Sequence, residues 1–390
     1  MKLHFPTDFL WGTSSAAAQV ETASAHSWRG VVARDGFVFN RTTDHELRRD
    51  EDLEYICSFG QVYRCGVDWA RLQPHAFAEY DAEVVAEYQL FFEKLTARGM
   101  KLMLVLHHFT NPIWFENMGG FTKQENNAAF LNYTAQYIEH FGQYAYTFNT
   151  FNEPCVYAAN GYVMGNFPPF KRNPFLANKV VKNMGEAHNA AFDLLKKAFP
   201  EKQVGISKNC ALFKAVNIWG ILPEKFANWW FNDYVMAHFE KVDFIGMSYY
   251  ALIPLTPFPV TEMDNPGKLA KMGYKTDKMW AYHPEGLRYF IQRFYNRYKK
   301  PIWITENGVC TEDSQVRIGA LKDYLTILHE LIAEGVPIIG YTHWSTWDNF
   351  EWNLGCTFRF GLVTVDFETM NRTMTDAGRF YTKIASENAL

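Results

Sequence analysis

Short β-rich runs alternate with longer amphipathic segments along almost the whole chain, and this alternation constrains the fold more than any other feature. It predicts a parallel sheet whose strands are joined by right-handed helical crossovers. Eight runs predict strands, at residues 9–13, 61–67, 101–107, 146–151, 204–207, 242–249, 301–305 and 337–342. The clearest helix-period segments cover residues 82–98, 128–141, 176–199, 224–239, 284–298, 316–334 and 376–385.

Eight strand–helix units without a linker or a low-complexity break predict an α/β fold, a single (β/α)8 TIM barrel over residues 1–390. The length of 390 residues by itself leaves one or two domains open. On the pattern alone, an open doubly wound sheet with extra strands is the alternative. Barrel enzymes carry their chemistry at the carboxyl ends of the strands, so functional residues are expected there.

The composition disfavours several classes of function. The 38 Lys plus Arg against 42 Asp plus Glu give a net charge of −4, whereas nucleic-acid binding requires a basic face. The longest purely aliphatic stretch, residues 102–106, is far shorter than the ~20 residues that span a bilayer. The first residues lack the apolar core of a signal peptide. We therefore expect a cytoplasmic protein without nucleic-acid or membrane partners, whose six scattered cysteines are mainly buried thiols.

Two glutamates are the strongest candidates for catalysis. Glu153 ends the fourth predicted strand between an asparagine and a proline, and Glu306 ends the seventh. Either acid alone could cap a helix or close a turn. Two acids that reach the same barrel mouth favour glycoside hydrolysis instead. In that reaction one carboxylic acid protonates the leaving oxygen, and the other attacks the sugar carbon or activates water.

The sequence gives little support to metal or cofactor chemistry. His107 and His108 are adjacent at a strand end, so their side chains face opposite ways and do not form a ligand pair. An H-E-x-x-H motif, a cysteine cluster, a Walker loop, a G-x-G-x-x-G fingerprint and a nucleophilic serine elbow are all missing from the sequence. We expect neither a metal nor a cofactor.

An aromatic and acidic segment after the last predicted strand is typical of a sugar pocket. Residues 344–352 read WSTWDNFEW and include Trp344, Glu351 and Trp352. Indole faces stack on the C–H face of a pyranose, and a carboxylate accepts hydrogen bonds from neighbouring hydroxyls. An aromatic lid packed for stability is the alternative interpretation of this segment.

These motifs, in this order, resemble the retaining β-glycosidases of glycoside hydrolase family one over essentially the whole chain. The resemblance implies an enzyme that hydrolyses terminal β-D-glucosides, or β-galactosides and β-fucosides, through a covalent glycosyl-enzyme intermediate. Its substrate partner would be a small β-glycoside or an oligosaccharide. The matching boxes are Phe5-Pro6 through Gln19, Tyr63-Arg64 through Trp69, His107-His108-Phe109 through Pro112, Asn152-Glu153-Pro154, residues 243–250, Thr305-Glu306-Asn307-Gly308 and residues 344–362.

The resemblance implies a role for each matching position. Glu153 would be the acid/base and Glu306 the nucleophile, and Arg64 and Tyr250 would form hydrogen bonds to Glu306. Asn152 would hold the sugar 2-hydroxyl. A retaining mechanism further predicts that the two catalytic carboxyl groups lie ~5 Å apart. The pocket for the non-reducing sugar would be lined by Gln19, His108, Trp344, Glu351 and Trp352.

Two other functions stay open within this resemblance. The 6-phospho-β-glycosidases are similar but carry Ser at the position of Glu351, and Lys and Tyr at those of Phe358 and Phe360. A carboxylate repels a phosphate dianion, so Glu351 disfavours phosphosugars. The second alternative is a sugar-binding homologue without activity, which the intact pair Glu153 and Glu306 disfavours.

The chain also departs from the family pattern. Ser248 stands where the family usually has Asn, and Thr22 follows Glu21 where Gly is usual. Residues 40–45 and 209–241 lack much of the loops that relatives have there. Because those loops form the walls of the leaving-group side in relatives, we expect a more open cleft and looser selection of the leaving group.

Overall fold

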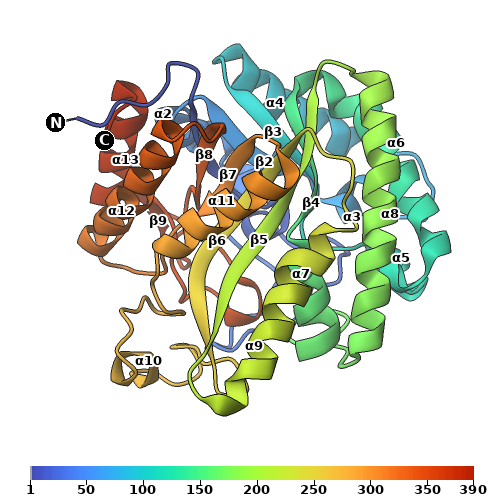
Figure 1. Cartoon of the computed structure of the whole chain (residues 1–390). Coiled ribbons are helices and arrows are strands. Elements are labelled where there is room, and N and C mark those ends of the chain that lie inside the picture. The colour runs from blue at the N-terminus through green and yellow to red at the C-terminus, as the bar shows by residue number, and fades with distance from the viewer. Residues whose placement is uncertain (1) are drawn as a thin grey trace.

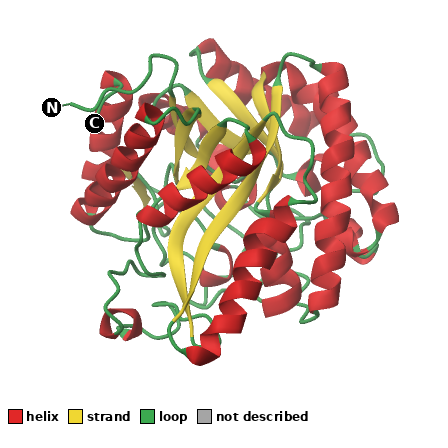
Figure 2. Cartoon of the chain, viewed as in Figure 1, coloured by secondary structure: helices red, strands yellow, loops and turns green. Residues whose placement is uncertain are grey.

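A closed barrel of eight parallel strands forms the centre of the computed structural model, which describes residues 2–390 (Figure 1). Each strand pairs with the next in the chain, and the eighth closes the barrel on the first, with Leu10 opposite Gly340. Helices surround the strands on the outside (Figure 2). The predicted (β/α)8 barrel is confirmed, and the open-sheet alternative is wrong.

All eight strands lie where the sequence predicts them, but two are longer than expected. Beyond Ser207 the fifth strand continues to Ala215, and the sixth continues to Leu255, because the two pair with each other past the barrel rim. A register shift after Cys210 interrupts the alternation that would have revealed this extension. The barrel strands are β1 (Leu10–Ser14), β2 (Val62–Gly66), β3 (Lys101–His107), β4 (Ala145–Asn152), β5 (Gln203–Ala215), β6 (Phe244–Leu255), β7 (Ile302–Asn307) and β8 (Ile338–Trp344), and a separate hairpin pairs β9 (Val363–Val365) with β10 (Arg372–Met374).

The long helices also match their predicted positions, with one correction. The segment predicted at 224–239 begins earlier, as α9, and continues as a π-helical stretch over Asn228–Tyr234. Six helices have no predicted range. Five of them have only four or five residues, too few to show a helical period, and the sixth, Arg49–Ser58, is rich in charged residues. The helices are α1 (Ala17–Val20), α2 (Arg49–Ser58), α3 (Trp69–Leu72), α4 (Ala82–Ala97), α5 (Ile113–Asn117), α6 (Asn127–Phe141), α7 (Pro154–Ala158), α8 (Pro174–Ala198), α9 (Ile221–Ala227), α10 (Lys268–Lys271), α11 (Glu285–Tyr298), α12 (Ser314–Ala333) and α13 (Asp376–Glu387).

Local sequence fixes where the outer helices begin and end. The Asp81 side chain accepts hydrogen bonds from the backbone N–H groups of Glu83 and Val84, which have no partner inside the helix, and so starts α4. Gly99 and Gly335 follow α4 and α12 with φ of 80° and 89°, a left-handed conformation that glycine adopts without strain. Each helix therefore stops just before the strand that follows it.

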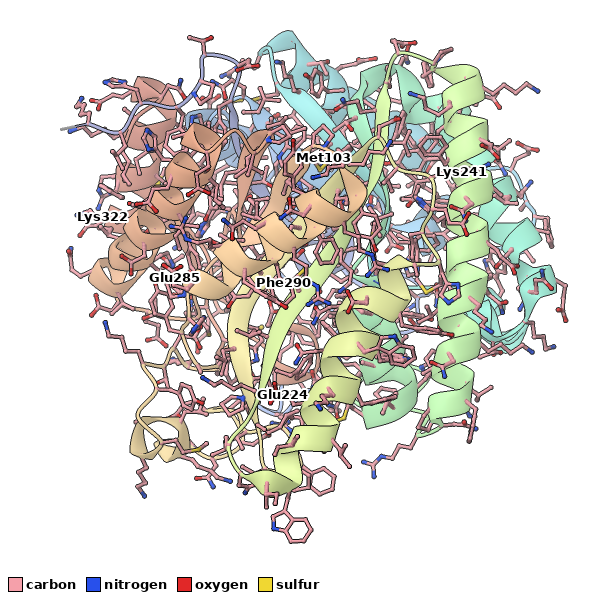
Figure 3. All side chains as sticks on the ribbon, in the orientation of Figure 1. Met103, Glu224, Lys241, Glu285, Phe290 and Lys322 are labelled. Carbon is pink, nitrogen blue, oxygen red and sulfur yellow. The ribbon has the colours of Figure 1, made fainter. Side chains whose placement is uncertain are left out.

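The barrel interior has an apolar layer at the amino ends of its strands. Leu10, Val62, Met103, Phe244 and Trp303 fill this layer, and all are at most 8% exposed (Figure 3 labels Met103). Side chains two positions further along each strand face the same interior, one layer closer to the carboxyl ends. The apolar layer thus closes the barrel at the amino ends of its strands. The layers nearer the carboxyl ends are left for polar residues.

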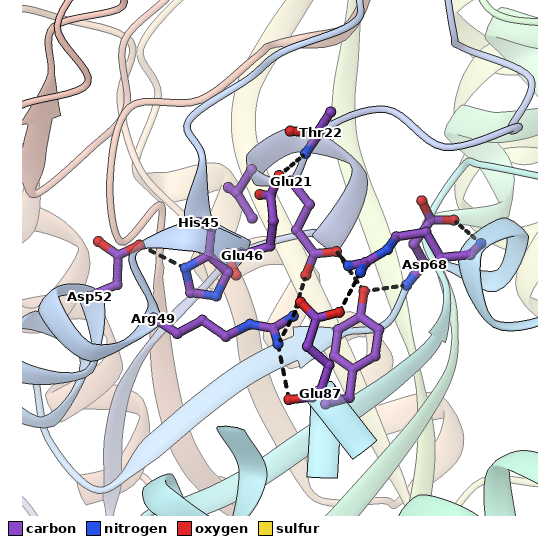
Figure 4. Close-up of polar contacts among 12 residues, drawn as sticks. Glu21, Thr22, His45, Glu46, Arg49, Asp52, Asp68 and Glu87 are labelled. Carbon is purple, nitrogen blue, oxygen red and sulfur yellow. Dashed lines mark hydrogen bonds and ion pairs between the residues drawn. The ribbon is translucent and has the colours of Figure 1, made fainter. Parts of the chain in front are cut away.

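A buried ionic cluster anchors the segment that follows β1. The Glu21 carboxylate accepts hydrogen bonds from Arg49, Arg71 and the Tyr88 hydroxyl (Figure 4). Burial raises the pKa of the Glu21 carboxyl, whereas the two guanidinium groups lower it. Because Glu21 directly follows α1, this cluster fixes the helix that carries Gln19.

Two further predictions concern the chain as a whole. Within residues 2–390, no helix combines the length and the apolar character that crossing a membrane requires. All six cysteines are free thiols, and five of them are buried, as the sequence predicts. The sixth, Cys57, is half-buried.

Candidate active site

A cavity of about 360 Å³ opens at the carboxyl ends of the barrel strands, where the sequence places the functional residues. Two of the ten predicted site residues, Arg64 and Gln19, do not line this cavity but form hydrogen bonds with residues that do. A larger hollow of about 610 Å³ lies on the outer surface at α2 and α4 and contains none of the predicted residues. The eight that line the barrel cavity are His108, Asn152, Glu153, Tyr250, Glu306, Trp344, Glu351 and Trp352.

Glu306, in β7, is held by two donors. Arg64 donates to its Oε1 at 2.6 Å, and the Tyr250 hydroxyl donates to its Oε2 at 2.9 Å. Burial raises the pKa of the Glu306 carboxyl, whereas the guanidinium charge and the two hydrogen bonds lower it. Both carboxylate oxygens are therefore fixed, and both donors favour the ionised form.

Arg64 organises the polar layer of the barrel. It lies two residues after Val62 on the same inner face of β2 and is fully buried. Its Nη1 donates to Ser14 as well as to Glu306, and its Nη2 donates to Asn152 Oδ1 at 2.6 Å and to Ser207 Oγ at 3.0 Å. A buried guanidinium requires such partners, because an unpaired charge in the interior is costly.

Asn152 and His108 continue this network toward the cavity. Asn152 Nδ2 lies 2.8 Å from His108 Nε2. Burial and the nearby Arg64 charge lower the pKa of His108 well below its usual value. The ring is therefore neutral and accepts the hydrogen bond from the Asn152 amide. The two side chains fix one another at the floor of the cavity.

Glu153 has a different environment from Glu306. It lies between β4 and α7, one residue beyond the end of the strand that the sequence expects it to close. Its φ is +45°, in the left-handed region. Within residues 2–390, the one side-chain hydrogen bond of normal geometry to this carboxyl comes from Asn209 Nδ2, at 2.8 Å from Oε1, and the nearby Ser248 hydroxyl also lowers the pKa of Glu153. Burial and the nearby Glu306 charge raise the pKa of Glu153 to about 8. At neutral pH this carboxyl group therefore holds a proton.

The residues expected to bind the non-reducing sugar lie together on one side of the cavity. The His108 ring lies between two indoles, with centroid distances of 5.9 Å to Trp344 and 6.0 Å to Trp352. Gln19 Nε2 donates to the Phe350 carbonyl at 2.8 Å and lies 3.4 Å from a Glu351 oxygen. Burial is the largest cause that raises the pKa of Glu351, and the charges of the two other glutamates add to it, to about 8.

Asn209 is a site residue that sequence reasoning missed. The sequence predicts that the fifth strand ends at residue 207, which makes Asn209 only the start of a shortened segment. In the structure it lies opposite Ser248 in the ladder between β5 and β6, beside the cavity. The Ser248 hydroxyl is buried and forms no hydrogen bond of normal geometry within residues 2–390. The signal in the sequence that could have identified Asn209 as a site residue is its position as a polar residue at the end of a barrel strand.

The β5–β6 side of the cavity has a mainly apolar wall. It comes from the extended parts of β5 and β6, from the π-helical stretch after α9 and from the loop between β6 and β7. The shortened segment 209–241 is thus only part of this wall, and the expected openness of this side stays a prediction. The wall includes Phe213, Phe231, Ile253, Pro259, Met263, Met279 and Trp280.

Over residues 2–390, the cavity lining shows neither a cluster of metal ligands nor a basic side chain that could pair with a phosphate. Among residues 2–390, no three His, Cys, Asp or Glu side chains are grouped as metal ligands. His107 turns away from the cavity and lies 2.9 Å from Asn111 Oδ1. Over the same residues, the cavity lining contains three carboxylates and no Lys or Arg. Arg359 points elsewhere and pairs with Asp348 at 2.7 Å.

The chain is similar to known proteins over nearly its whole length. A model of the family described as "Glycosyl hydrolase family 1" matches residues 1–216 and 231–390. "Beta-glucosidase A" of Thermotoga maritima is 29% identical, with 99% of this chain and 98% of that protein covered. "Beta-glucosidase" of Agrobacterium sp. is 28% identical, over 98% and 95%.

A solved structure shares the whole fold. The "beta-glycosidase from Pyrococcus horikoshii" superposes with a TM-score of 0.90 at 29% identity, covering 100% of this chain and 96% of that one. The alignment with the Thermotoga relative runs over 445 positions, more than the 390 residues of this chain. That relative therefore has segments that this chain lacks.

Proposed function

The chain belongs to glycosyl hydrolase family 1, and on that premise we propose that it is a retaining exo-β-glycosidase acting on terminal, non-reducing β-D-glucosyl residues. β-Galactosyl and β-fucosyl residues are alternative sugars. One observation carries the proposal, namely the contrast between the two glutamates. Glu306 is fixed by two donors that favour its charged form, whereas burial and that charge raise the pKa of Glu153 to about 8.

The first step uses Glu306 as nucleophile and Glu153 as acid. A carboxylate oxygen of Glu306 attacks the anomeric carbon, and the bond from that carbon to the leaving oxygen breaks. Glu153 gives its proton to the leaving oxygen as the covalent glycosyl-enzyme forms. Arg64 and Tyr250 keep the attacking carboxylate ionised and aimed. Since Glu153 protonates the leaving oxygen, the leaving group lies on the side of the cavity next to Glu153 and Asn209.

The second step reverses the role of Glu153. Once Glu306 is esterified its negative charge is gone, and with it one of the two main causes of the raised pKa of Glu153. The pKa of Glu153 falls, so its carboxylate takes a proton from water as the water attacks the anomeric carbon. The released Glu306 regains its charge, and Glu153 is again protonated. Each glutamate thus sets the protonation of the other.

The remaining residues are assigned to the sugar. Asn152 would hold the 2-hydroxyl, since its amide lies between Arg64 and His108 at the cavity floor. Trp344, Trp352 and His108 offer stacking faces, and Gln19 and Glu351 offer hydrogen bonds to neighbouring hydroxyls. The lining disfavours a 6-phosphorylated sugar, because over residues 2–390 it offers the phosphate no Lys or Arg, and Glu306 carries a negative charge there.

A panel of nitrophenyl glycosides tests the proposal. We expect the β-D-glucoside to be hydrolysed with retention, and its 6-phosphate and the α-glucoside to react far more slowly. Glu306→Gly should lose hydrolysis and regain turnover with azide, giving the α-glycosyl azide. Glu153→Gln should lose hydrolysis while still folding and binding sugar.

Three results would contradict this assignment. A preference for the 6-phosphate would favour the phosphoglycosidase alternative. Sugar binding without turnover of any glycoside would favour a non-catalytic homologue. A crystal structure with the carboxyl groups of Glu153 and Glu306 more than ~6.5 Å apart would favour inversion, since retention requires ~5 Å.

A further inference from the structure

A stripe of large apolar side chains faces outward from the segment that links β5 to β6. It consists of Ile218, Trp219, Leu222, Phe226 and Trp229, and each of them is at least half exposed. Four of the five lie three or four residues apart, so they share one side of the helical segment 218–229. Contiguous apolar surface of this kind marks an interaction site rather than scattered surface residues. We call these five residues the apolar stripe.

The apolar stripe belongs to this chain rather than to the family pattern. The family model matches residues up to 216 and again from 231, so the segment 217–230 that carries the stripe lies outside the match. The segment is well anchored from behind. Asn228 forms hydrogen bonds with both backbone groups of Phe213, and Asn232 does the same with Ala211. The stripe is thus held rigidly outward.

The stripe adjoins the mouth of the active-site cavity. Figure 1 places α9 beside the carboxyl ends of β5 and β6, and Figure 3 labels Glu224 on it. Phe231, on the same helical segment, lines the cavity and packs on Phe213 at a centroid distance of 5.4 Å. On the facing loop Pro259 lines the cavity, while its neighbour Phe258 is 78% exposed. Apolar surface therefore continues from the leaving-group wall out onto the rim.

The charges around the stripe fit an anionic lipid surface. Lys214 and Lys225 are exposed beside it, and the acid of this segment, Glu224, turns inward to accept a hydrogen bond from the Ala215 backbone at 2.7 Å. Tryptophan side chains next to lysines are typical of segments that lie in a membrane interface. A protein partner or a second copy seated on this rim would lie across the cavity mouth, whereas a lipid surface would present substrate to it.

Against the expectation from composition that the chain has no membrane partner, we propose that the apolar stripe docks on a lipid bilayer surface and that the natural leaving group is a long-chain lipid. The second half rests on the proposed glycosidase function. The glycosyl head would occupy the cavity, the first part of the chain would lie along Phe213 and Phe231, and the rest would cross the rim at Phe258 into the lipid. Docking would bring the enzyme to substrates that are scarce in free solution.

Two measurements test the proposal, and the first does not depend on catalysis. The purified chain is floated with vesicles of phosphatidylcholine and phosphatidylglycerol in about a four-to-one ratio. We expect binding that weakens in high salt and falls at least about tenfold in the triple variant Trp219→Ser, Leu222→Ser, Phe226→Ser. The matched control, Leu47→Ser, Leu90→Ser, Tyr289→Ser, changes exposed apolar residues elsewhere and should bind like the unmodified chain.

The second measurement compares alkyl β-glucosides below their micelle concentrations with nitrophenyl β-glucoside. We expect kcat/KM to rise at least about tenfold from the butyl to the octyl glucoside, since each added methylene is removed from water. The triple variant should keep its activity on the soluble nitrophenyl substrate and lose the advantage on glucosides embedded in vesicles.

The outcomes separate the two proposals. A chain that hydrolyses no glucoside but binds vesicles through the stripe would overturn the proposed function and the lipid leaving group, and leave docking intact. Hydrolysis without vesicle binding, or without a chain-length effect, would overturn the present inference alone. A dimer that becomes monomeric in the triple variant, with no vesicle binding by either form, would show that a second copy covers the stripe and would also overturn it.

Discussion

Removal of the Asn209 amide should move the alkaline limit of activity to higher pH. Asn209 donates a hydrogen bond to Glu153 at 2.8 Å, and of the two side-chain donors that lower the pKa of Glu153, Asn209 and Ser248, it has the larger effect. Glu153 must be protonated to act as an acid, so activity is present below its pKa of about 8 and is lost as the pH rises through that value. In Asn209→Ala the carboxylate loses this donor, so the proton is held more tightly.

The size of the change follows from the strength of that hydrogen bond. A hydrogen bond to a charged group contributes about 1.5–3 kcal/mol, and a change of one in pKa corresponds to about 1.4 kcal/mol. We therefore expect the pKa of Glu153 to rise by about one to two. The alkaline limb of kcat/KM should move to about pH 9 to 10. The acidic limb reports ionisation of Glu306 and should move much less.

The assay is the pH dependence of kcat/KM for a nitrophenyl β-glucoside. Asn160→Ala is the matched control, because this amide also lines the cavity but donates to the Val156 carbonyl rather than to a carboxylate. The control should keep the alkaline limb of the unmodified chain. An alkaline limb that stays in place or moves down in Asn209→Ala would refute the reasoning, since it would mean that Asn209 does not stabilise the charged form of Glu153.

Two further predictions concern the nucleophile and the stability of the barrel. Tyr250→Phe removes one of the two donors to Glu306 and should lower kcat by about ten- to a hundredfold with a smaller change in KM, measured by steady-state kinetics; an unchanged kcat would contradict its role. Arg372→Ala leaves the fully buried Asp52 without its guanidinium partner and should cost about 3–5 kcal/mol of unfolding free energy, measured by thermal or denaturant unfolding. Lys2→Ala, which breaks an exposed pair, should leave the unfolding midpoint unchanged.

Much of the candidate site could be predicted from the sequence, because each residue sits in a distinctive local motif at a strand end. Glu153 and Glu306 are recognisable in this way, and both line the same cavity. Asn209 was missed for a physical reason. The ladder between β5 and β6 shifts register and continues past the barrel, so alternation along the chain no longer marks the strand.

The apolar wall was missed for a different reason. Phe213 and Phe231 read in the sequence as ordinary core aromatics, since hydrophobic pattern does not distinguish a core from the lining of a cavity. The exposed Phe226 and Trp229 likewise fit the apolar pattern of the helix predicted at 224–239. The side of a helix that remains uncovered depends on what packs against it, and that is a property of the folded chain.

The alternation of strand and helix patterns was enough to predict the eight-stranded barrel, and the motifs at strand ends were enough to single out Glu153 and Glu306 as candidate catalytic acids. Both depend on local patterns, namely the period of the apolar residues and short motifs at strand ends. The resemblance already implied that Glu153 is the acid and Glu306 the nucleophile, and the folded structure supplies the physical reason for that difference. That difference arises because Arg64 and Tyr250, far apart in sequence, meet at Glu306, whereas Glu153 receives one amide and faces a neighbouring charge. Electrostatic environment is set by distance and burial, which are fixed when the barrel closes.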